Sequence, residues 1–381
     1  MIGLAFMSFT ICPQFTELDH DIIHDFSDCL QENIDQIEIC LGLLDNTYDL
    51  KLVHRLFRDV HSLKGNCRMV FLEPLVDTIH SLEEIVSDMR QGTKTYSRLY
   101  GEFIAAIVVR INQMVLGFVN EGQVEGEPHL LMNEVIERVR LCTDGTEDET
   151  INAALDTLVG CRNTKKEQEP PGTKTSRKNE EPLACTTETH PDLIFFRKLA
   201  LQLDELNIYK RGRTQTILDL CLSTNEDLNN LVDKEQLTAA VYLHDLGMSL
   251  IPSEILNKPS KLTNEEFQLI KNHVETGSQL LKRMPGWEEA AQMVNQHHEK
   301  YNGSGYPQGL SQDSIHPGAM IIALADTFYA VTNERADRSY KKSLFSAVTL
   351  INGESGSQFD PRYVEAFNET VRRHYIAPKS T

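Results

Sequence analysis

The sequence lacks the features that mark membrane-spanning and secreted proteins. No uncharged apolar run approaches the roughly eighteen residues that a helix needs to span a bilayer. Residues 1–11 are apolar, but they lack a basic start and are too short for a normal secretory signal, so we expect a packing arm unless Met7 is the true start. The eight cysteines include no C-x-x-C pair, which favours reduced thiols over a disulfide framework. We therefore predict a cytoplasmic protein without membrane insertion.

Positive charge is also scarce. The chain has 37 Lys and Arg residues against 56 Asp and Glu residues, which gives a formal net charge of -19. This balance opposes non-specific binding to a nucleic acid polymer or to an anionic membrane surface. Any phosphate-bearing ligand must then be met by local positive groups or by a metal ion, so we expect the ligand to be small.

Strand-like alternation of apolar and polar residues is rare, and there is no repeat at solenoid spacing. Apolar residues recur at helical spacing instead, and one such stripe consists of Leu52, Leu56, Val60 and Leu63. Pro74 suits a first helical turn and Gly92 suits a helix stop, so the sequence predicts a helix over 74–91. The fold class predicted for the whole chain is all-α.

A chain of 381 residues is too long for one ordinary core and suits two domains joined by a linker. The helical pattern fades into "NTKKEQEPPGTKTSRKNEEP", whose mixed charge and prolines are typical of a flexible segment. Helical periodicity then returns at about residue 190. We predict an N-terminal antiparallel helical bundle over 1–142, a flexible linker over 143–187 and a second helical domain over 188–381.

Histidines and aspartates gather at apolar positions of the second domain. The stretch "AAVYLHDLG" runs an apolar segment directly into His244 and Asp245. In "WEEAAQMVNQHHEKY", His297 and His298 continue the stripe that packs inward. Asp326 is the one carboxylate in "AMIIALADTFYAV", and a lone buried carboxylate is costly unless it is paired or bound to a metal.

One such histidine is more often a hydrogen-bonded core residue than a ligand. Four histidines and two aspartates together are better explained as ligands of iron, manganese, nickel or zinc. The predicted ligands are His244, Asp245, His273, His297, His298 and Asp326. Asp245 could bridge two ions, which is the usual arrangement for hydrolysis of a phosphodiester.

The motifs "HDLG", "IPSEILNKPSKLTNEEF", "HHEKYNGSGYPQGL", "ALAD" and "FDP" resemble, in this order, the HD-GYP family of bacterial phosphodiesterases. The resemblance implies an all-helical HD fold, a centre of two or three metal ions, with iron or manganese expected, and hydrolysis of cyclic di-GMP to pGpG or GMP. It also implies that the six residues above are metal ligands and that Asp245 is catalytic. The residues matching the family's ligand-binding loop are Gly303, Gly305, Tyr306 and Pro307. The family's RPYR element is found only as "RSYK", from Arg338 to Lys341.

The resemblance is incomplete beside the reaction centre. The family has a further histidine ligand before the HD pair, but no histidine occurs between residues 191 and 243, and Lys210 stands near its expected place. Met248 replaces a usual lysine, and a thioether cannot hold phosphate as an ammonium can. One metal site would be complete, and it consists of Asp245, His273, His297 and His298; the other would keep His244, Asp245 and Asp326. An open three-ligand site can be catalytic, so both an active hydrolase and a degenerate binding domain are compatible with the sequence.

A second group of polar residues lies in "RDVHSLKGN" and in the helix after it. His61 follows the core stripe by one residue, so we expect it on the flank of its helix, accessible to solvent. Lys64 lies beside it at i+3, and Gly65 removes a side chain that would cover it. His80 and Glu83 share a face of the next helix, and such a partner can fix the tautomer of a histidine and raise its nucleophilicity toward phosphorus. The alternative is a solvated charged face.

This region resembles a histidine phosphotransfer (Hpt) domain, because "FRDVHSLKG" and "HSLEEIVSDMRQG" match its phosphorylation motif and its following helix. The resemblance implies a phosphorylatable His61 supported by Lys64, His80 and Glu83. No ATP-binding glycine motif is present, so the phosphoryl group is expected to come from a response-regulator receiver domain or a histidine kinase.

The two motif sets together predict a bacterial two-component signalling protein that joins phosphotransfer to a metal-dependent cyclic di-GMP phosphodiesterase. One alternative is a catalytically degenerate second domain that binds cyclic di-GMP or another protein. Another is a hydrolase that acts on a different nucleotide, since a fold-level resemblance does not fix the substrate.

Overall fold

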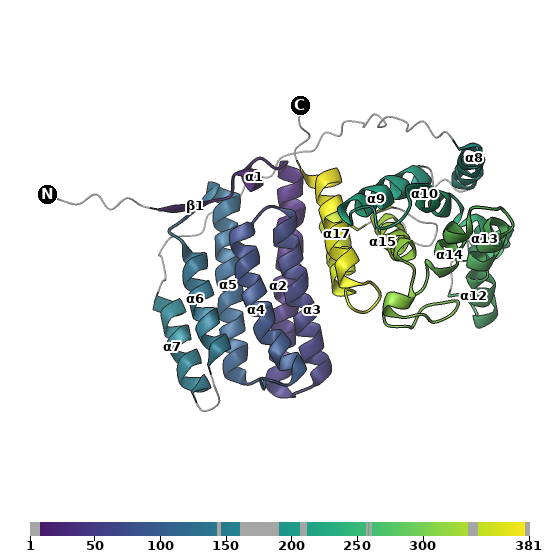
Figure 1. Cartoon of the computed structure of the whole chain (residues 1–381). Coiled ribbons are helices and arrows are strands. Elements are labelled where there is room, and N and C mark those ends of the chain that lie inside the picture. Colours follow the sequence, from purple (N-terminus) through teal and green to yellow (C-terminus); the bar gives the residue numbers. More distant parts are fainter. Residues whose placement is uncertain are drawn as a thin grey trace.

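The computed structural model describes residues 8–142, 146–160, 190–205, 212–256, 258, 261–333 and 342–377. Two helical halves lie side by side, and the only named strands in these residues, β1 (Phe9–Ile11) and β2 (Gln123–Glu125), form an antiparallel pair (Figure 1). The predicted all-α fold is confirmed. The part of the N-terminal arm that is described thus packs against the first half through β1.

Four long helices form the bundle of the first half. They are α2 (His20–Asn46), α3 (Leu50–Met69), α4 (Glu73–Gln91) and α5 (Arg98–Glu121). Val60 and Leu63 of α3 are fully buried, as the apolar stripe predicts. The helix predicted over 74–91 is confirmed as α4, which has Pro74 in its first turn and ends at Gly92 with a φ of 79°. A positive φ of this size favours glycine, so the helix stops there.

Helix α5 is long and apolar enough to cross a membrane by length and composition, and it is the one such helix in the described part of the chain. It packs against α1 (Pro13–Thr16), α2 and α7 (Glu147–Gly160). Its buried face includes Phe103, Ile107 and Ile111, none of which is exposed to solvent. The apolar composition of α5 is thus accounted for by its place in the bundle.

The prediction of a flexible linker over 143–187 is wrong for its first part. After α6 (Pro128–Leu141), α7 packs against both α5 and α6. Ile151, Ala154 and Leu158 share one face of α7 and are buried, which explains why this segment joins the bundle. Residues 161–187 lie outside the described residues.

The second half consists of shorter helices around the predicted ligands. The helices before the glycine-rich loop are α8 (Pro191–Glu205), α9 (Arg213–Asp227), α10 (Lys234–Leu243), η2 (Leu246–Leu250), α11 (Ser253–Leu256), α12 (Asn264–Lys271), α13 (His273–Lys282) and α14 (Glu288–Gln296). Those after it are η3 (Gln312–Ser314), α15 (Pro317–Thr332), α16 (Leu344–Gly353), α17 (Pro361–Val371) and η4 (Arg372–Ile376). Thr263 and Glu266 form a capping box that opens α12.

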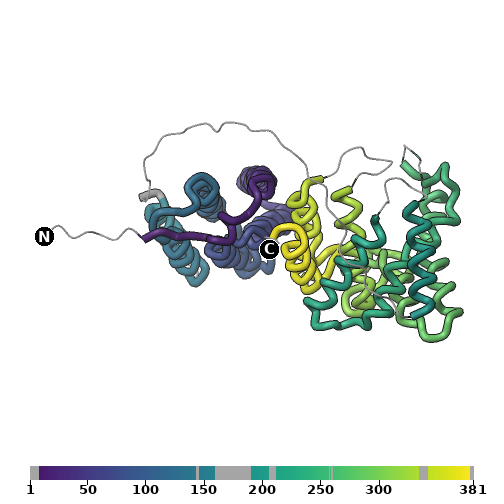
Figure 2. The backbone as a smooth tube through the Cα atoms, turned by 90° about the horizontal axis from the view of Figure 1, so that it is seen from above, coloured from purple at the N-terminus to yellow at the C-terminus, as the bar shows by residue number. Residues whose placement is uncertain are grey.

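Helices α16 and α17 lie between the first bundle and the rest of the second half, as the view from above shows (Figure 2). Helix α16 packs against α2 and α3, and α17 also contacts α3. The rings of Phe26 in α2 and Phe345 in α16 meet edge to face with centroids 5.6 Å apart. Both rings are fully buried, so the apolar core is continuous between the two halves.

Candidate metal centre and phosphoacceptor site

Three histidines converge at the ends of helices in the second half. His273 begins α13, while His297 and His298 follow α14. Their candidate ligand nitrogens all lie within 4.8 Å of one another. His273 and His297 present Nε2 to Nε2 at 3.4 Å. The structure therefore brings three of the predicted ligands together.

Hydrogen bonds to backbone carbonyls fix which nitrogen of each ring carries the proton. His273 Nδ1 contacts the carbonyl of Ile270 at 2.6 Å, and His297 Nδ1 contacts that of Val294 at 2.7 Å. These carbonyls belong to helix ends, where the intrahelical acceptor sites are left open. A carbonyl can only accept, so each Nδ1 carries the proton and each Nε2 presents a lone pair. Two lone pairs that face each other at 3.4 Å are the arrangement expected of ligands that share a cation.

Burial keeps the imidazoles of His297 and His298 neutral at neutral pH. It lowers the pKa of His297 well below the ordinary value, and the neighbouring histidines lower it further. Burial also lowers the pKa of His298 to about 4. Asp245 adds an oxygen, because its Oδ1 lies 3.5 Å from His273 Nε2. Three imidazoles and one carboxylate suit an iron, manganese, nickel or zinc ion, so these four residues fit one metal ion.

The other predicted ligands surround an arginine. Arg213, at the start of α9, places Nη2 2.6 Å from Asp326 Oδ1 and 2.9 Å from Asp245 Oδ2. The same nitrogen lies 3.0 Å from His244 Nε2, and His244 Nδ1 contacts the carbonyl of Val241 at 2.7 Å. The guanidinium thus takes the contacts that His244, Asp245 and Asp326 would offer to an ion. In this arrangement the three donors do not fit a second metal ion.

The charges of this cluster agree with its geometry. Burial opposes the ionised form of Asp326, but the guanidinium of Arg213 outweighs it and lowers the pKa of that carboxyl. Burial likewise opposes the charge of Arg213, and Asp245 and Asp326 outweigh it and raise its pKa. The cluster therefore carries a permanent positive charge between two carboxylates. Sequence reasoning missed Arg213, although the lone carboxylate of Asp326 in an apolar helix was a signal that a cation must lie nearby.

The glycine-rich loop after α14 closes over the histidines. Tyr306 stacks on His298 with ring centroids 4.9 Å apart and an interplanar angle of 29°. A Cβ on Gly305 would overlap the backbone of Glu299 and Lys300, so only glycine fits there. The carboxylate of Glu299 accepts hydrogen bonds from three loop amides: Gln308 at 2.6 Å, Gly309 at 3.1 Å and Leu310 at 3.0 Å. Glu299, which sequence reasoning also missed, fixes the loop beside the centre.

The predicted phosphoacceptor group forms one cluster in the first half. His61 Nδ1 lies 2.5 Å from Glu83 Oε1, and Lys64 Nζ donates to the other oxygen of the same carboxylate. His80 Nδ1 is 3.4 Å from Glu83 Oε2. The His61 ring stacks beside Phe57 with centroids 6.2 Å apart. With Nδ1 held by the carboxylate, Nε2 of His61 presents a lone pair.

Glu83 stays ionised even though it is buried. Burial raises its pKa, but hydrogen bonds from His61 and Lys64 outweigh it and lower the pKa to about 2. The side chain of Glu83 is 8 % exposed, against 27 % for His61 and 58 % for His80. Glu83 is therefore the principal partner of His61, and His80 lies at the edge of the cluster.

Three further residues singled out in the sequence lie in the glycine-rich loop and in η2. Gly303 and Pro307 belong to the glycine-rich loop, and Gly303 has a φ of 80°. Met248 lies in η2, directly after the HD pair, and is partly buried. Lys210, Arg338 and Lys341 lie outside the described residues.

Comparison with known proteins matches two family models to the chain. The model described as "Hpt domain" matches residues 21–114, and the model described as "HD domain" matches residues 199–363. The first range contains His61 and Glu83, and the second contains the histidine cluster and Arg213.

Curated relatives match about a third of the chain. A cyclic di-GMP phosphodiesterase of Thermotoga maritima is 40% identical over 130 residues, which are 34% of this chain and 35% of the relative. The cyclic di-GMP phosphodiesterase response regulator RpfG of Xanthomonas campestris is 38% identical over 131 residues, covering 33% and 34%. A 3'3'-cGAMP-specific phosphodiesterase 2 of Vibrio cholerae is 37% identical over 131 residues, covering 33% and 24%. The chain thus spans about a third or less of the length of these relatives. Together, these matches show that the chain joins an Hpt domain to an HD domain that is similar to those of cyclic di-GMP phosphodiesterases.

Proposed function

We propose that this protein is a cytoplasmic signalling protein of a bacterial two-component system, in which His61 accepts a phosphoryl group and the HD domain hydrolyses cyclic di-GMP. The observation that carries the hydrolase is the pair of Nε2 atoms of His273 and His297, which face each other at 3.4 Å with both Nδ1 atoms bonded to carbonyls. The names of the relatives support the substrate class.

One divalent ion, iron or manganese, is proposed for the centre. Its ligands would be Asp245, His273, His297 and His298. When bound, such an ion supplies an activated water nucleophile and a Lewis acid for a phosphodiester. The sequence predicts two ions, whereas the contacts of Arg213 with His244 and Asp326 favour one.

Protein groups around the ion would hold the dinucleotide. Arg213 fixes a positive charge beside Asp245, where it can stabilise negative charge that develops on the phosphate oxygens. Burial raises the pKa of Tyr306, so its hydroxyl remains protonated and available to donate a hydrogen bond. One cleavage would give pGpG, and a second would give GMP.

Phosphotransfer is proposed to occur at Nε2 of His61. Glu83 holds Nδ1–H, so the lone pair of Nε2 attacks the phosphorus of an aspartyl phosphate. The N–P bond forms as the O–P bond breaks, the aspartate leaves as a carboxylate, and the proton on Nδ1 stays between His61 and Glu83. A receiver domain carries such a phosphate, and a histidine kinase could supply the group from its own phosphohistidine.

The test combines metal content and turnover in one anaerobic preparation. Metal analysis should give one iron or manganese ion per chain, and chromatography should show cyclic di-GMP converted to pGpG or GMP. A His297→Ala variant should lose both the ion and turnover, whereas His24→Ala, a change on the exposed surface of α2, should keep both. Running 3'3'-cGAMP in parallel tests the substrate assignment. Bound metal without turnover of either dinucleotide would contradict the proposed hydrolase.

A binding module without catalysis is the second candidate, and the contacts of Arg213 favour it. A guanidinium cannot generate the nucleophile that a second ion would supply, and Met248 offers no ammonium for a phosphate. In that case the protein would bind cyclic di-GMP in equilibrium dialysis and release it unchanged. A double variant, Lys210→His with Met248→Lys, distinguishes the two candidates. A large gain in turnover would favour a degenerate domain, and no gain would count against it.

A further inference from the structure

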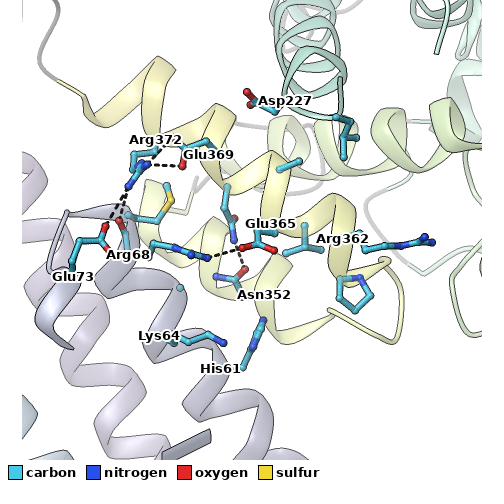
Figure 3. Close-up of a pocket in the computed structure, with 17 residues that line it drawn as sticks. His61, Lys64, Arg68, Glu73, Asp227, Asn352, Arg362, Glu365, Glu369 and Arg372 are labelled. Carbon is cyan, nitrogen blue, oxygen red and sulfur yellow. Dashed lines mark hydrogen bonds and ion pairs between the residues drawn. The ribbon is translucent and has the colours of Figure 1, made fainter. Parts of the chain in front are cut away.

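The face of α3 that carries His61 is covered by the second domain. A pocket of about 690 Å³ lies between them, lined by His61 and Lys64 on one side and by Asn352 and Glu365 on the other (Figure 3). A Cβ on Gly65 would overlap the side chain of Asn352, so the space left by the glycine after the phosphoacceptor is filled from α16. A donor domain that approached along this face would meet α16 and α17 first.

Buried polar contacts hold the covering helix in place. Asn66 Nδ2 donates to Thr349 Oγ1 at 2.8 Å and to Asn33 Oδ1 at 2.7 Å. Cys29 Sγ lies 3.1 Å from Thr349 Oγ1, so this one threonine of α16 contacts both α2 and α3. Buried polar groups cost free energy unless they are paired, so separation requires water or new partners at these positions.

The charged groups around the pocket are already paired. Its lysine and arginine side chains are Lys64, Arg68, Arg362 and Arg372, and each is bonded to at least one carboxylate. Arg68 Nη1 lies 2.8 Å from Glu365 Oε1 and joins the domains at the rim (Figure 3). Asn352 Nδ2 is buried and has no hydrogen-bond partner among the described residues.

A phosphoryl group on His61 would change this balance. It adds a charge of about −1.5 to −2 at neutral pH. Within the closed pocket it could gain an arginine only by taking it from an existing ion pair. Taking Arg68 from Glu365, for example, would leave that carboxylate facing the phosphoryl group across the interface. Like charges repel at such an interface, and the one unpaired amide of Asn352 offers a single hydrogen bond in return.

We propose that the α16–α17 surface is an internal docking partner of the phosphoacceptor face, and that phosphorylation of His61 releases it. The inference rests on His61 being the phosphoacceptor proposed above. The Arg68–Glu365 pair is exposed at the rim and contributes little by itself. We therefore expect the phosphoryl group to lower, by a moderate factor, the fraction of molecules in which α16 and α17 cover His61. Release would couple the first domain to the HD domain and would free the face for a donor domain.

A cross-link between the domains tests the release. In a Thr349→Cys variant, the new thiol would lie against Cys29, and mild oxidation should join them within the closed protein. Phosphoramidate serves as a small donor: its P–N bond breaks, ammonia leaves, and a bond forms between phosphorus and Nε2 of His61. After this treatment the rate of cross-linking should fall by about fivefold or more. The same treatment of a His61→Gln, Thr349→Cys protein should leave the rate unchanged.

The outcomes separate this inference from the phosphoacceptor assignment. Mass spectrometry first locates the phosphoryl group. If His61 is not phosphorylated, both the assignment and the release are overturned, whereas phosphorylation with an unchanged rate overturns the release alone. If the Thr349→Cys variant does not fold, amide hydrogen exchange of residues 344–353 in the unaltered protein gives the same decision. Exchange there should become faster on phosphorylation, and unchanged exchange would overturn the proposal.

Discussion

Glu83 is a buried carboxylate whose charge is maintained by two partners, and this makes the first domain sensitive to acid. Hydrogen bonds from His61 and Lys64 hold its pKa at about 2 despite burial. An unfolded glutamate has a pKa of about 4.3. Since the folded value is the lower one, the carboxylate stabilises the folded protein above pH 4.3, and this contribution is lost as the pH falls from about 4.3 through about 2.

The Glu83→Gln variant should therefore be less stable at pH 7 by about 2–3 kcal/mol. Its stability should also depend less on pH between about 5 and 2 than that of the unaltered protein. Urea unfolding of the full chain at several pH values measures both effects. Glu102→Gln, which removes an exposed pair with Arg98, is the matched control and should change stability by less than about 1 kcal/mol. Equal pH dependence of the variant and the unaltered protein would contradict this account.

Arg213 should determine how many metal ions the centre binds. Replacing it with alanine leaves Asp245 and Asp326 without their cation and opens three donors, so an added ion should take its place. We expect the metal content of Arg213→Ala to rise from one ion to about two per chain. Without metal, the variant should lose about 3–5 kcal/mol of stability, because two buried carboxylates are left uncompensated. Arg283→Ala, at an exposed position, should change neither quantity. An unchanged metal content would show that Arg213 does not exclude a second ion.

Some residues of the two sites could be identified from the sequence, and others could not. His273, His297 and His61 were predictable, because helical periodicity states which face a residue shares with its neighbours. Arg213 was not, because its partner Asp326 is 113 positions away and only the fold brings the two together. The same holds for Asn352, which meets Gly65 across the two domains. Periodicity carries information about one element and none about its partner.

At the scale of elements, the glycine-rich loop depends on one carboxylate. Glu299 accepts the amides of Gln308, Gly309 and Leu310, and it is 5 % exposed. In Glu299→Ala these three donors lose their acceptor, so their amide hydrogen exchange should become at least about tenfold faster. Glu289→Ala, which removes a half-exposed carboxylate near His316, should leave the three amides unaffected. Unchanged protection of the loop in Glu299→Ala would mean that other contacts hold it.

The helix that carries His273 shows where sequence prediction of elements fails. Its apolar pattern predicts one continuous helix from Thr263 to Leu281 with Phe267 on the inner face. The structure breaks it into α12 and α13 at Asn272, and Phe267 is 43 % exposed. The break places the Ile270 carbonyl at a helix end, where His273 Nδ1 can reach it. The capping box marked where the helix begins, but no proline or glycine marked the interruption.

At the scale of the whole molecule, the sequence predicts two domains separated by a linker, but it does not show that they share a core. Phe26 and Phe345 are 319 positions apart in sequence, and each reads simply as an apolar residue of its own helix. Their contact closes α16 onto α2 and thereby covers the face of His61. The arrangement depends on a match between two surfaces, which a pattern within one segment cannot specify.

Phe345→Ala should therefore loosen both domains at once. Truncation of a fully buried phenylalanine costs about 3–5 kcal/mol. Because the Phe345 ring also packs against Phe26, amide exchange should become faster in α2 and α3 as well as in α16. Phe367→Ala removes an equally buried ring whose partner, Phe328, belongs to the second domain. It should lower the stability of that domain by a similar amount and leave the exchange of α2 and α3 unchanged. If both variants affect only the second domain, the shared core does not couple the two halves, and the release proposed for His61 would have no mechanical route to the HD centre.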